Sequence, residues 1–177
     1  MSVAARVAEK PPRAASALGL PFWHPAVLIA TGGGIGFLPG MPGTWASLAA
    51  LPSAWAIRWL SHGRTWPLAV AALAAFLAGW WAASRVTRAS GRVDPGAVVI
   101  DEIAAQWLVL LAAPLDPRAY AVAFLLFRVF DILKPWPIRW IERRVRGGLG
   151  IMVDDTGAAI YAVVLLLIGE GIFGVRP

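Results

Sequence analysis

The chain contains 177 residues, of which 59% are hydrophobic, with a mean hydropathy of +0.68 and a formal net charge of +6. This hydrophobic fraction is higher than that of ordinary soluble domains, and it predicts an integral membrane protein. The absence of cysteine excludes disulfide scaffolds, thiolate metal sites and cysteine nucleophiles, and the separated His24 and His62 lack the spacing of a zinc site.

The apolar runs predict an all-α, polytopic membrane bundle of about five to six helices, some of them short or broken. Residues 1–22 are expected to form a polar tail, because prolines interrupt any run long enough for a signal peptide. The stretch 25–38 is apolar but contains four glycines, and it is expected to be a short or broken helix. Further apolar runs follow at residues 44–60, 66–84, 103–115, 119–133 and 157–175. Only 66–84 and 157–175 approach the ~20 residues that cross a bilayer.

Lysine and arginine are distributed unevenly between the predicted connections. With a cytoplasmic N-terminus and five crossings, only Arg64, Arg118 and Arg176 fall on the outer side, and Arg58 is placed to snorkel toward it. Tryptophans lie mostly near the ends of the apolar runs, which is typical of an aromatic belt. The basic residues therefore indicate orientation in a bilayer, and no motif for binding nucleic acid accompanies them.

Carboxylates gather at the predicted cytoplasmic ends of three segments. They are Asp94, Asp101, Glu102, Asp131, Asp154 and Asp155. An ionisable group at membrane depth is costly unless it is paired or binds a cation. Arg128 and Lys134 flank Asp131 at i−3 and i+3 and could pair with it on one helical face. A hard divalent cation could neutralise the rest, and oxygen-only ligands favour Mg²⁺, with Mn²⁺ as the other candidate. A structural network of ion pairs is an equally supported alternative at this point.

Glycine-rich segments accompany these acids. TGGGIGFLPGMPGTWAS, residues 31–47, can bring backbone N–H groups and a helix N-terminus, with Thr44 beside it, against a phosphate. GGLGIMVDDTGAA, residues 147–159, places two acids beside the predicted start of the next helix. In FRVFDILKPWPIRW, residues 127–140, the prolines are expected to end the helix that carries the two cations. Two cations beside a metal cluster suit a phosphate ligand.

Four segments together resemble the phosphatidylglycerophosphatase A family. They are GIGFLPGMPGTWAS, DPGAVVIDEIAAQW, FRVFDILKPWPIRW and GGLGIMVDDTGAA, which run from Gly34 to Ala159 in the order of the family. Ala46, Ala105 and Ala159 stand where the family is expected to have glycine, and residues before about Phe22 carry no resemblance. The resemblance implies that residues 23–177 form a membrane-embedded helical phosphatase domain. It further implies Mg²⁺-dependent hydrolysis of phosphatidylglycerophosphate to phosphatidylglycerol in the bacterial inner (cytoplasmic) membrane, with the active site facing the cytoplasm.

The residues that the resemblance assigns to the site are the six acids above, Arg128 and Lys134. We expect Asp101, Asp154 and Asp155 to hold the metal, with Glu102 and Asp131 as further ligands or groups that orient water. Asp94 is a further candidate, while Arg128, Lys134 and Thr44 would bind phosphate oxygens. Attack by water and attack by a carboxylate both remain open, and no oligomeric state is predicted.

Two other functions compete with a lipid phosphatase. A CDP-alcohol phosphotransferase also uses membrane carboxylates and a divalent metal, but its DG-x-x-AR pattern is absent from this chain. A cation transporter would be expected to place its acids near the middle of the membrane, between broken helices. Here the acids are expected on one side.

Overall fold

The computed structural model describes residues 18–173, and within this range the chain is entirely helical. The elements are α1 (Pro25–Ala30), the 3₁₀ turn η2 (Ile35–Phe37), α2 (Pro42–Leu60), α3 (Trp66–Ser90), α4 (Ile100–Leu110), α5 (Pro117–Leu133), α6 (Ile138–Arg144) and α7 (Gly147–Phe173). The all-α prediction is confirmed for these residues, and the broken helix expected at 25–38 is α1 followed by η2.

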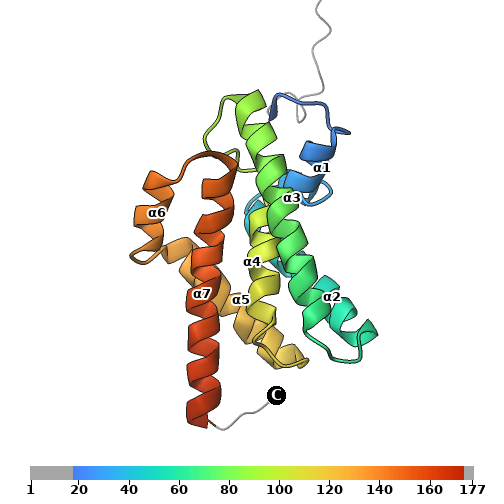
Figure 1. The fold of residues 1–177 in the computed structure, drawn as a ribbon, viewed down its shortest axis with the longest axis vertical. Helices are drawn as coiled ribbons and strands as arrows, with labels where there is room; N and C mark the ends of the chain where they lie inside the picture. Colours follow the sequence, from blue (N-terminus) through green and yellow to red (C-terminus); the bar gives the residue numbers. More distant parts are fainter. Residues whose placement is uncertain (1–17, 174–177) are drawn as a thin grey trace, which may run out of the picture.

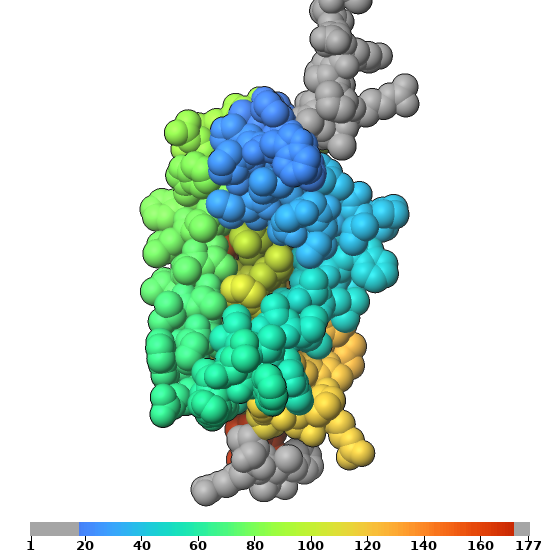
Figure 2. Space-filling view, turned by 90° about the vertical axis from the view of Figure 1, so that its right-hand side faces the viewer, coloured from blue at the N-terminus to red at the C-terminus, as the bar shows by residue number. Residues whose placement is uncertain are grey.

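Helix α4 is the central element of the bundle, although it is shorter than α2, α3, α5 and α7. It packs against α2, α3, α5 and α7, and Figure 1 shows it between α3 and α7. Viewed from the side in Figure 2, α2 and α3 cover α4 except for a narrow strip between them. Val109 and Leu110 of α4 are fully buried, as is Phe127 of α5, which belongs to the same apolar cluster. Burial of such side chains contributes roughly 1.5–3 kcal/mol each.

Helices α3 and α7 are long and apolar enough to cross a membrane, with mean hydropathies of 1.6 and 2.0 over their most apolar windows. Both carry large aliphatic side chains that the bundle leaves exposed, such as Leu73 and Leu77 on α3 and Leu167 and Ile168 on α7. Rows of this kind are unusual on a soluble monomer. The outer faces of these two helices therefore have the character of lipid-facing surfaces.

The structure moves two helix starts relative to the sequence expectations. Helix α4 begins at Ile100, and α7 begins at Gly147, ten residues before the expected position. The glycines at the start of α7 serve helix packing: a Cβ on Gly148 would overlap the backbone nitrogen of Ser84 on α3. Because small residues allow two helices to approach closely, this segment is helical where the sequence suggested a loop. The acids that follow it are thus held on a rigid helix.

The prolines after α5 end that helix as expected, but a short helix, α6, follows them. Ile138 of α6 is buried and packs against Gly157 of α7, and the Tyr161 hydroxyl of α7 donates to the Trp136 carbonyl oxygen at 2.7 Å. These contacts fix α6 against α7. A long-range contact of this kind has no signal in the local sequence, so α6 was not expected. Residues 18–173 contain seven α-helices, one more than the upper end of the expected range of about five to six.

Two polar side-chain contacts tie α4 and the residues after it to α2. Arg58 is only 7% exposed, and its Nη1 donates to the carbonyl oxygens of Ala113 at 2.5 Å and Leu110 at 3.4 Å. The expectation that Arg58 snorkels outward was wrong, because the carbonyl end of α4 attracts a cation. Trp107 donates through Nε1 to the Ala50 carbonyl oxygen at 3.1 Å and links α4 to α2.

Candidate active site

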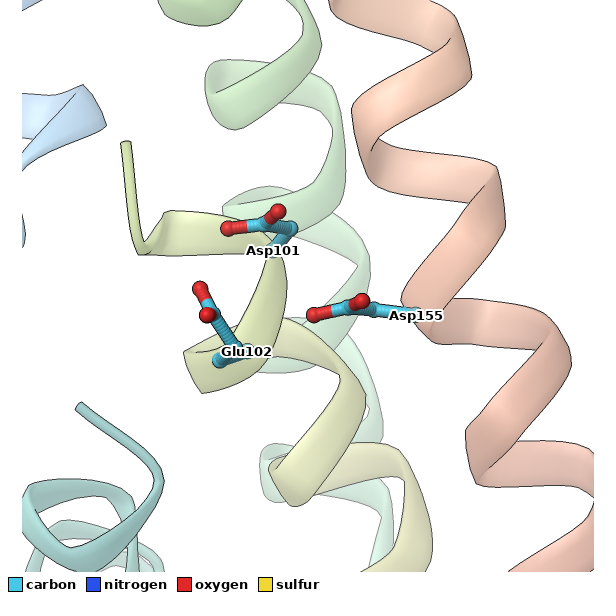
Figure 3. A group of neighbouring side chains, drawn as sticks. All are labelled: Asp101, Glu102 and Asp155. Atoms are coloured by element: carbon cyan, nitrogen blue, oxygen red, sulfur yellow. The ribbon is translucent and has the colours of Figure 1, made fainter. Parts of the chain in front are cut away.

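Three carboxylates from two distant segments meet at the centre of the site. Asp101 and Glu102 lie in the first turn of α4, and Asp155 lies on α7 and points across toward them (Figure 3). One oxygen of each lies within 4.8 Å of the oxygens of the other two. Acids in a first helical turn are favoured by the helix dipole, which helps to explain why α4 tolerates two of them.

These carboxylates are buried without enough protein partners. Asp101 is 8% exposed and Asp155 is 4% exposed. Among the described residues, one oxygen each of Asp101, Glu102, Asp154 and Asp155 has no hydrogen-bond partner, and none of the three clustered acids forms a salt bridge. Burying like charges together is strongly unfavourable. An oxygen-only cluster with unused acceptor oxygens therefore fits a hard divalent cation such as Mg²⁺.

Asp154, the neighbour of Asp155, faces a different partner. One of its oxygens accepts a hydrogen bond from the Lys134 ammonium group, which also contacts Glu142 at 3.3 Å. Burial by itself would lower the pKa of Lys134, but the hydrogen bond to Asp154 and the surrounding carboxylates raise it above its usual range. Lys134 consequently stays positively charged beside the cluster.

Arg128 supplies the second cation and pairs with Asp131, with Nη1 and Oδ2 2.5 Å apart. The sequence also suggested Lys134 as a partner of Asp131, but the structure pairs Lys134 with Asp154 and Glu142. The reason is local geometry: α5 ends at Leu133, and Lys134 adopts a left-handed conformation with φ of 43°. The helical i+3 spacing therefore does not extend to Lys134.

The start of α2 lies directly against Glu102 and Arg128. A Cβ on Gly43 would overlap Glu102 Oε1 and would lie 3.4 Å from Arg128 Nη1, so only glycine allows this approach. Thr44 follows in the same turn and is partly buried. The positive end of the α2 dipole thus faces the Glu102 carboxylate, an arrangement that favours negative charge.

The glycine-rich loop before α2 does not offer its amides to a ligand in the way that the sequence suggested. The backbone N–H groups of Gly33, Gly34 and Gly36 donate to carbonyl oxygens of Leu28 and Thr31. A Cβ on Gly36 would overlap the Ala97 carbonyl oxygen. The loop therefore packs against the segment before α4 and positions the start of α2.

Asp94 precedes α4 and lines a small pocket of about 100 Å³ with Asp101, Glu142, Arg146 and Asp154. Burial raises the pKa of the Asp94 carboxyl above its usual range, Lys134 opposes this increase, and Glu142 adds to it. The structure thus brings all six sequence-predicted acids, Arg128, Lys134 and Thr44 into one region formed by α2, α4, α5, α7 and the segment before α4.

Comparison with known proteins adds an independent observation. The family described as Phosphatidylglycerophosphatase A matches residues 28–170. The chain belongs to the phosphatidylglycerophosphatase A family. This finding confirms the resemblance inferred from the four sequence segments.

Individual relatives cover most of the chain. It is 37% identical over 151 residues to Phosphatidylglycerophosphatase A of Escherichia coli, with 84% of each chain covered. It is 39% identical over 144 residues to the protein of that name from Haemophilus influenzae, covering 81% of this chain and 87% of the relative. A "Putative phosphatidylinositol-3-phosphatase" of Bacteroides thetaiotaomicron is 37% identical over 158 residues, covering 84% of this chain and 95% of the relative. No solved structure matches the chain.

Two polar residues of this phosphatidylglycerophosphatase A family member escaped the sequence argument. Gln106 of α4 is fully buried, and neither atom of its amide has a hydrogen-bond partner among the described residues. It lies four residues after Glu102, so helical periodicity could have placed it on the same face. Glu142, which sequence reasoning grouped with the basic residues around it, contacts Lys134 and lines the Asp94 pocket.

Proposed function

We propose that this chain is a Mg²⁺-dependent phosphatase that hydrolyses phosphatidylglycerophosphate to phosphatidylglycerol and inorganic phosphate. The observation that carries the proposal is the buried cluster of Asp101, Glu102 and Asp155, whose unpaired oxygens call for a cation. Membership of the phosphatidylglycerophosphatase A family supports a lipid phosphomonoester as the substrate that binds at this cluster. The E. coli and H. influenzae relatives carry the name of this activity.

Asp101, Glu102 and Asp155 would hold Mg²⁺, with Mn²⁺ as an alternative ion. Asp154 would be a further ligand through Oδ1, which has no hydrogen-bond partner among the described residues. When bound, such an ion polarises a phosphoryl oxygen and lowers the pKa of coordinated water. The acids cannot bind the anionic substrate by themselves because they repel it. Their arrangement therefore requires cations from the protein as well.

Lys134 and Arg128 supply these cations. Each is held by a carboxylate, Lys134 by Asp154 and Arg128 by Asp131, so each side chain is oriented before substrate arrives. Arginine and lysine bind phosphate oxygens through charge-assisted hydrogen bonds. Thr44, which follows Gly43 in the first turn of α2, would be a further donor to phosphate. Neutralisation and positioning of the phosphoryl group account for most of the catalysis expected in phosphoryl transfer.

A membrane setting accounts for the remaining features. The exposed aliphatic rows of α3 and α7 would face acyl chains, and the other helices would complete a polytopic bundle in the bacterial inner membrane. The excess of arginine and lysine near the site end supports a cytoplasmic position for that end, by the positive-inside rule. The phosphate of a bilayer lipid would then reach the carboxylate cluster at headgroup level.

The direct test is release of inorganic phosphate from phosphatidylglycerophosphate by the purified protein in detergent, with Mg²⁺ and with a chelator. We expect release that the chelator abolishes and that Mg²⁺ restores. A CDP-alcohol phosphotransferase or a cation transporter would release no phosphate. Phosphatidylinositol 3-phosphate serves as the comparison substrate, because the B. thetaiotaomicron relative is named for it. If phosphatidylinositol 3-phosphate is hydrolysed faster than phosphatidylglycerophosphate, the proposed substrate is wrong.

A further inference from the structure

A second pocket lies beside Lys134, between the end of α5 and α6. It measures about 310 Å³ and is lined by Leu133, Lys134, Trp136, Arg139, Trp140 and Arg143, among others. The pocket beside Asp94 is about 100 Å³. Lys134 lines the larger pocket, and its ammonium group bonds Asp154, which lines the smaller one. The bond between Lys134 and Asp154 therefore makes the two pockets neighbours at the candidate active site.

The larger pocket is lined by two arginines that form no ion pair with the described residues. Arg139 and Arg143 are exposed and lie four residues apart on α6, which places two like charges on one face. Neither forms a salt bridge with any described residue. Arg139 donates one hydrogen bond, to the Leu133 carbonyl oxygen at 2.9 Å, and Arg143 donates none within residues 18–173. Most of their N–H groups are available to an anion.

The pocket also has an apolar rim suited to a lipid. Trp136 is 79% exposed and Trp140 is 50% exposed, and amphipathic indole rings favour the headgroup level of a bilayer. The rim is rigidly placed, because Ile138 is buried against α7 and Tyr161 holds the Trp136 carbonyl oxygen. The Arg144 guanidinium lies 4.7 Å from the centre of the Trp140 ring and adds to that placement.

We propose that this pocket binds the inner phosphodiester of the substrate lipid, through Arg139 and Arg143, while the terminal phosphomonoester occupies the carboxylate site. The inference rests on the proposed function, since phosphatidylglycerophosphate carries both phosphates, joined by glycerol. Charge complementarity identifies the anion, and the contact between Lys134 and Asp154 brings the two pockets close enough for one headgroup to reach both. Trp136 and Trp140 would meet the lipid where its acyl chains begin.

This arrangement provides substrate selection. A lipid that carries only a phosphomonoester, such as phosphatidic acid, would occupy the carboxylate site and leave the arginines without a partner. The product, phosphatidylglycerol, carries only the phosphodiester and would bind the arginines without occupying the carboxylate site. Inorganic phosphate would occupy the carboxylate site without needing the arginines. These two molecules therefore probe the two pockets separately.

The test measures binding of phosphatidylglycerol in non-ionic detergent micelles, and of inorganic phosphate, to the full chain with Mg²⁺ present. The variant is Arg139→Gln with Arg143→Gln, and the control is Arg88→Gln, an exposed arginine of α3 that lines neither pocket. We expect the double variant to bind phosphatidylglycerol at least about tenfold more weakly, because hydrogen bonds between charged groups contribute on this order. Its affinity for inorganic phosphate should equal that of the parent.

Three results would overturn the inference. They are unchanged binding of phosphatidylglycerol by the double variant, an equal loss in the Arg88→Gln control, and a parallel loss of inorganic phosphate binding. Circular dichroism confirms that each variant is folded before binding is measured, and single Gln variants replace the double variant if it does not fold. Failure of the proposed function is distinct: the parent would release no phosphate, while phosphatidylglycerol would still bind in an arginine-dependent manner.

Discussion

Replacing Gly43 with alanine tests whether close packing against α2 positions the Glu102 carboxylate. In the Gly43→Ala variant the new Cβ would overlap Glu102 Oε1 and lie 2.9 Å from Glu102 Cδ, whereas ordinary contacts begin at 3.4 Å. The carboxyl carbon must therefore move by about 0.5 Å, and its oxygen by more. Misplacement by ~1 Å at a catalytic group costs on the order of 10²-fold in rate. We expect kcat/KM for phosphate release to fall by roughly ten- to hundredfold.

Stability should change far less than activity in this variant. Overpacking costs about 1–3 kcal/mol, but the obstructing atoms are the end of a flexible side chain, and alanine gains about 1 kcal/mol of helix propensity over glycine. The matched control is Gly169→Ala, a glycine of α7 with nothing within 4 Å of its Cβ position. Phosphate release and thermal unfolding are measured in the same detergent over a Mg²⁺ titration. Parent activity in Gly43→Ala would refute the positioning argument.

Other changes separate the site from the scaffold. Asp155→Asn should abolish most Mg²⁺-dependent phosphate release without lowering the melting temperature measured in chelator, because it removes like-charge repulsion; undiminished activity would exclude Asp155 from the site. Lys134→Met should lower both kcat/KM and the melting temperature, since it leaves a buried carboxylate unpaired; release at the parent rate would contradict its role with phosphate. Arg58→Met should lower the free energy of unfolding by about 1–3 kcal/mol, measured by denaturation, while the folded protein keeps its specific activity; a loss of specific activity would place Arg58 in the site. Cysteines introduced by Arg92→Cys and Arg64→Cys should label from opposite sides of the membrane; labelling from one side would overturn the topology.

The sequence by itself predicted the helical class of the fold and the residues that the structure gathers at the candidate site. Composition and apolar runs predicted an all-α protein, because burial in lipid or in a helical core requires such runs whatever the tertiary arrangement. The acids in otherwise apolar segments indicated a candidate site, because ionisable groups there are costly unless they are paired or bind a cation. Four segments in order were sufficient to identify the family, which the comparisons confirm.

Tertiary structure decided which of these residues meet. Asp154 and Asp155 are adjacent in sequence, but consecutive residues on a helix point about 100° apart, so one faces Lys134 and the other faces Asp101 and Glu102. The contact between Gly43 and Glu102 joins α2 to α4 and has no local signal. The same holds for the placement of α6 by contacts with α7. These pairings depend on how helices pack over long sequence separations, and local sequence patterns do not encode them.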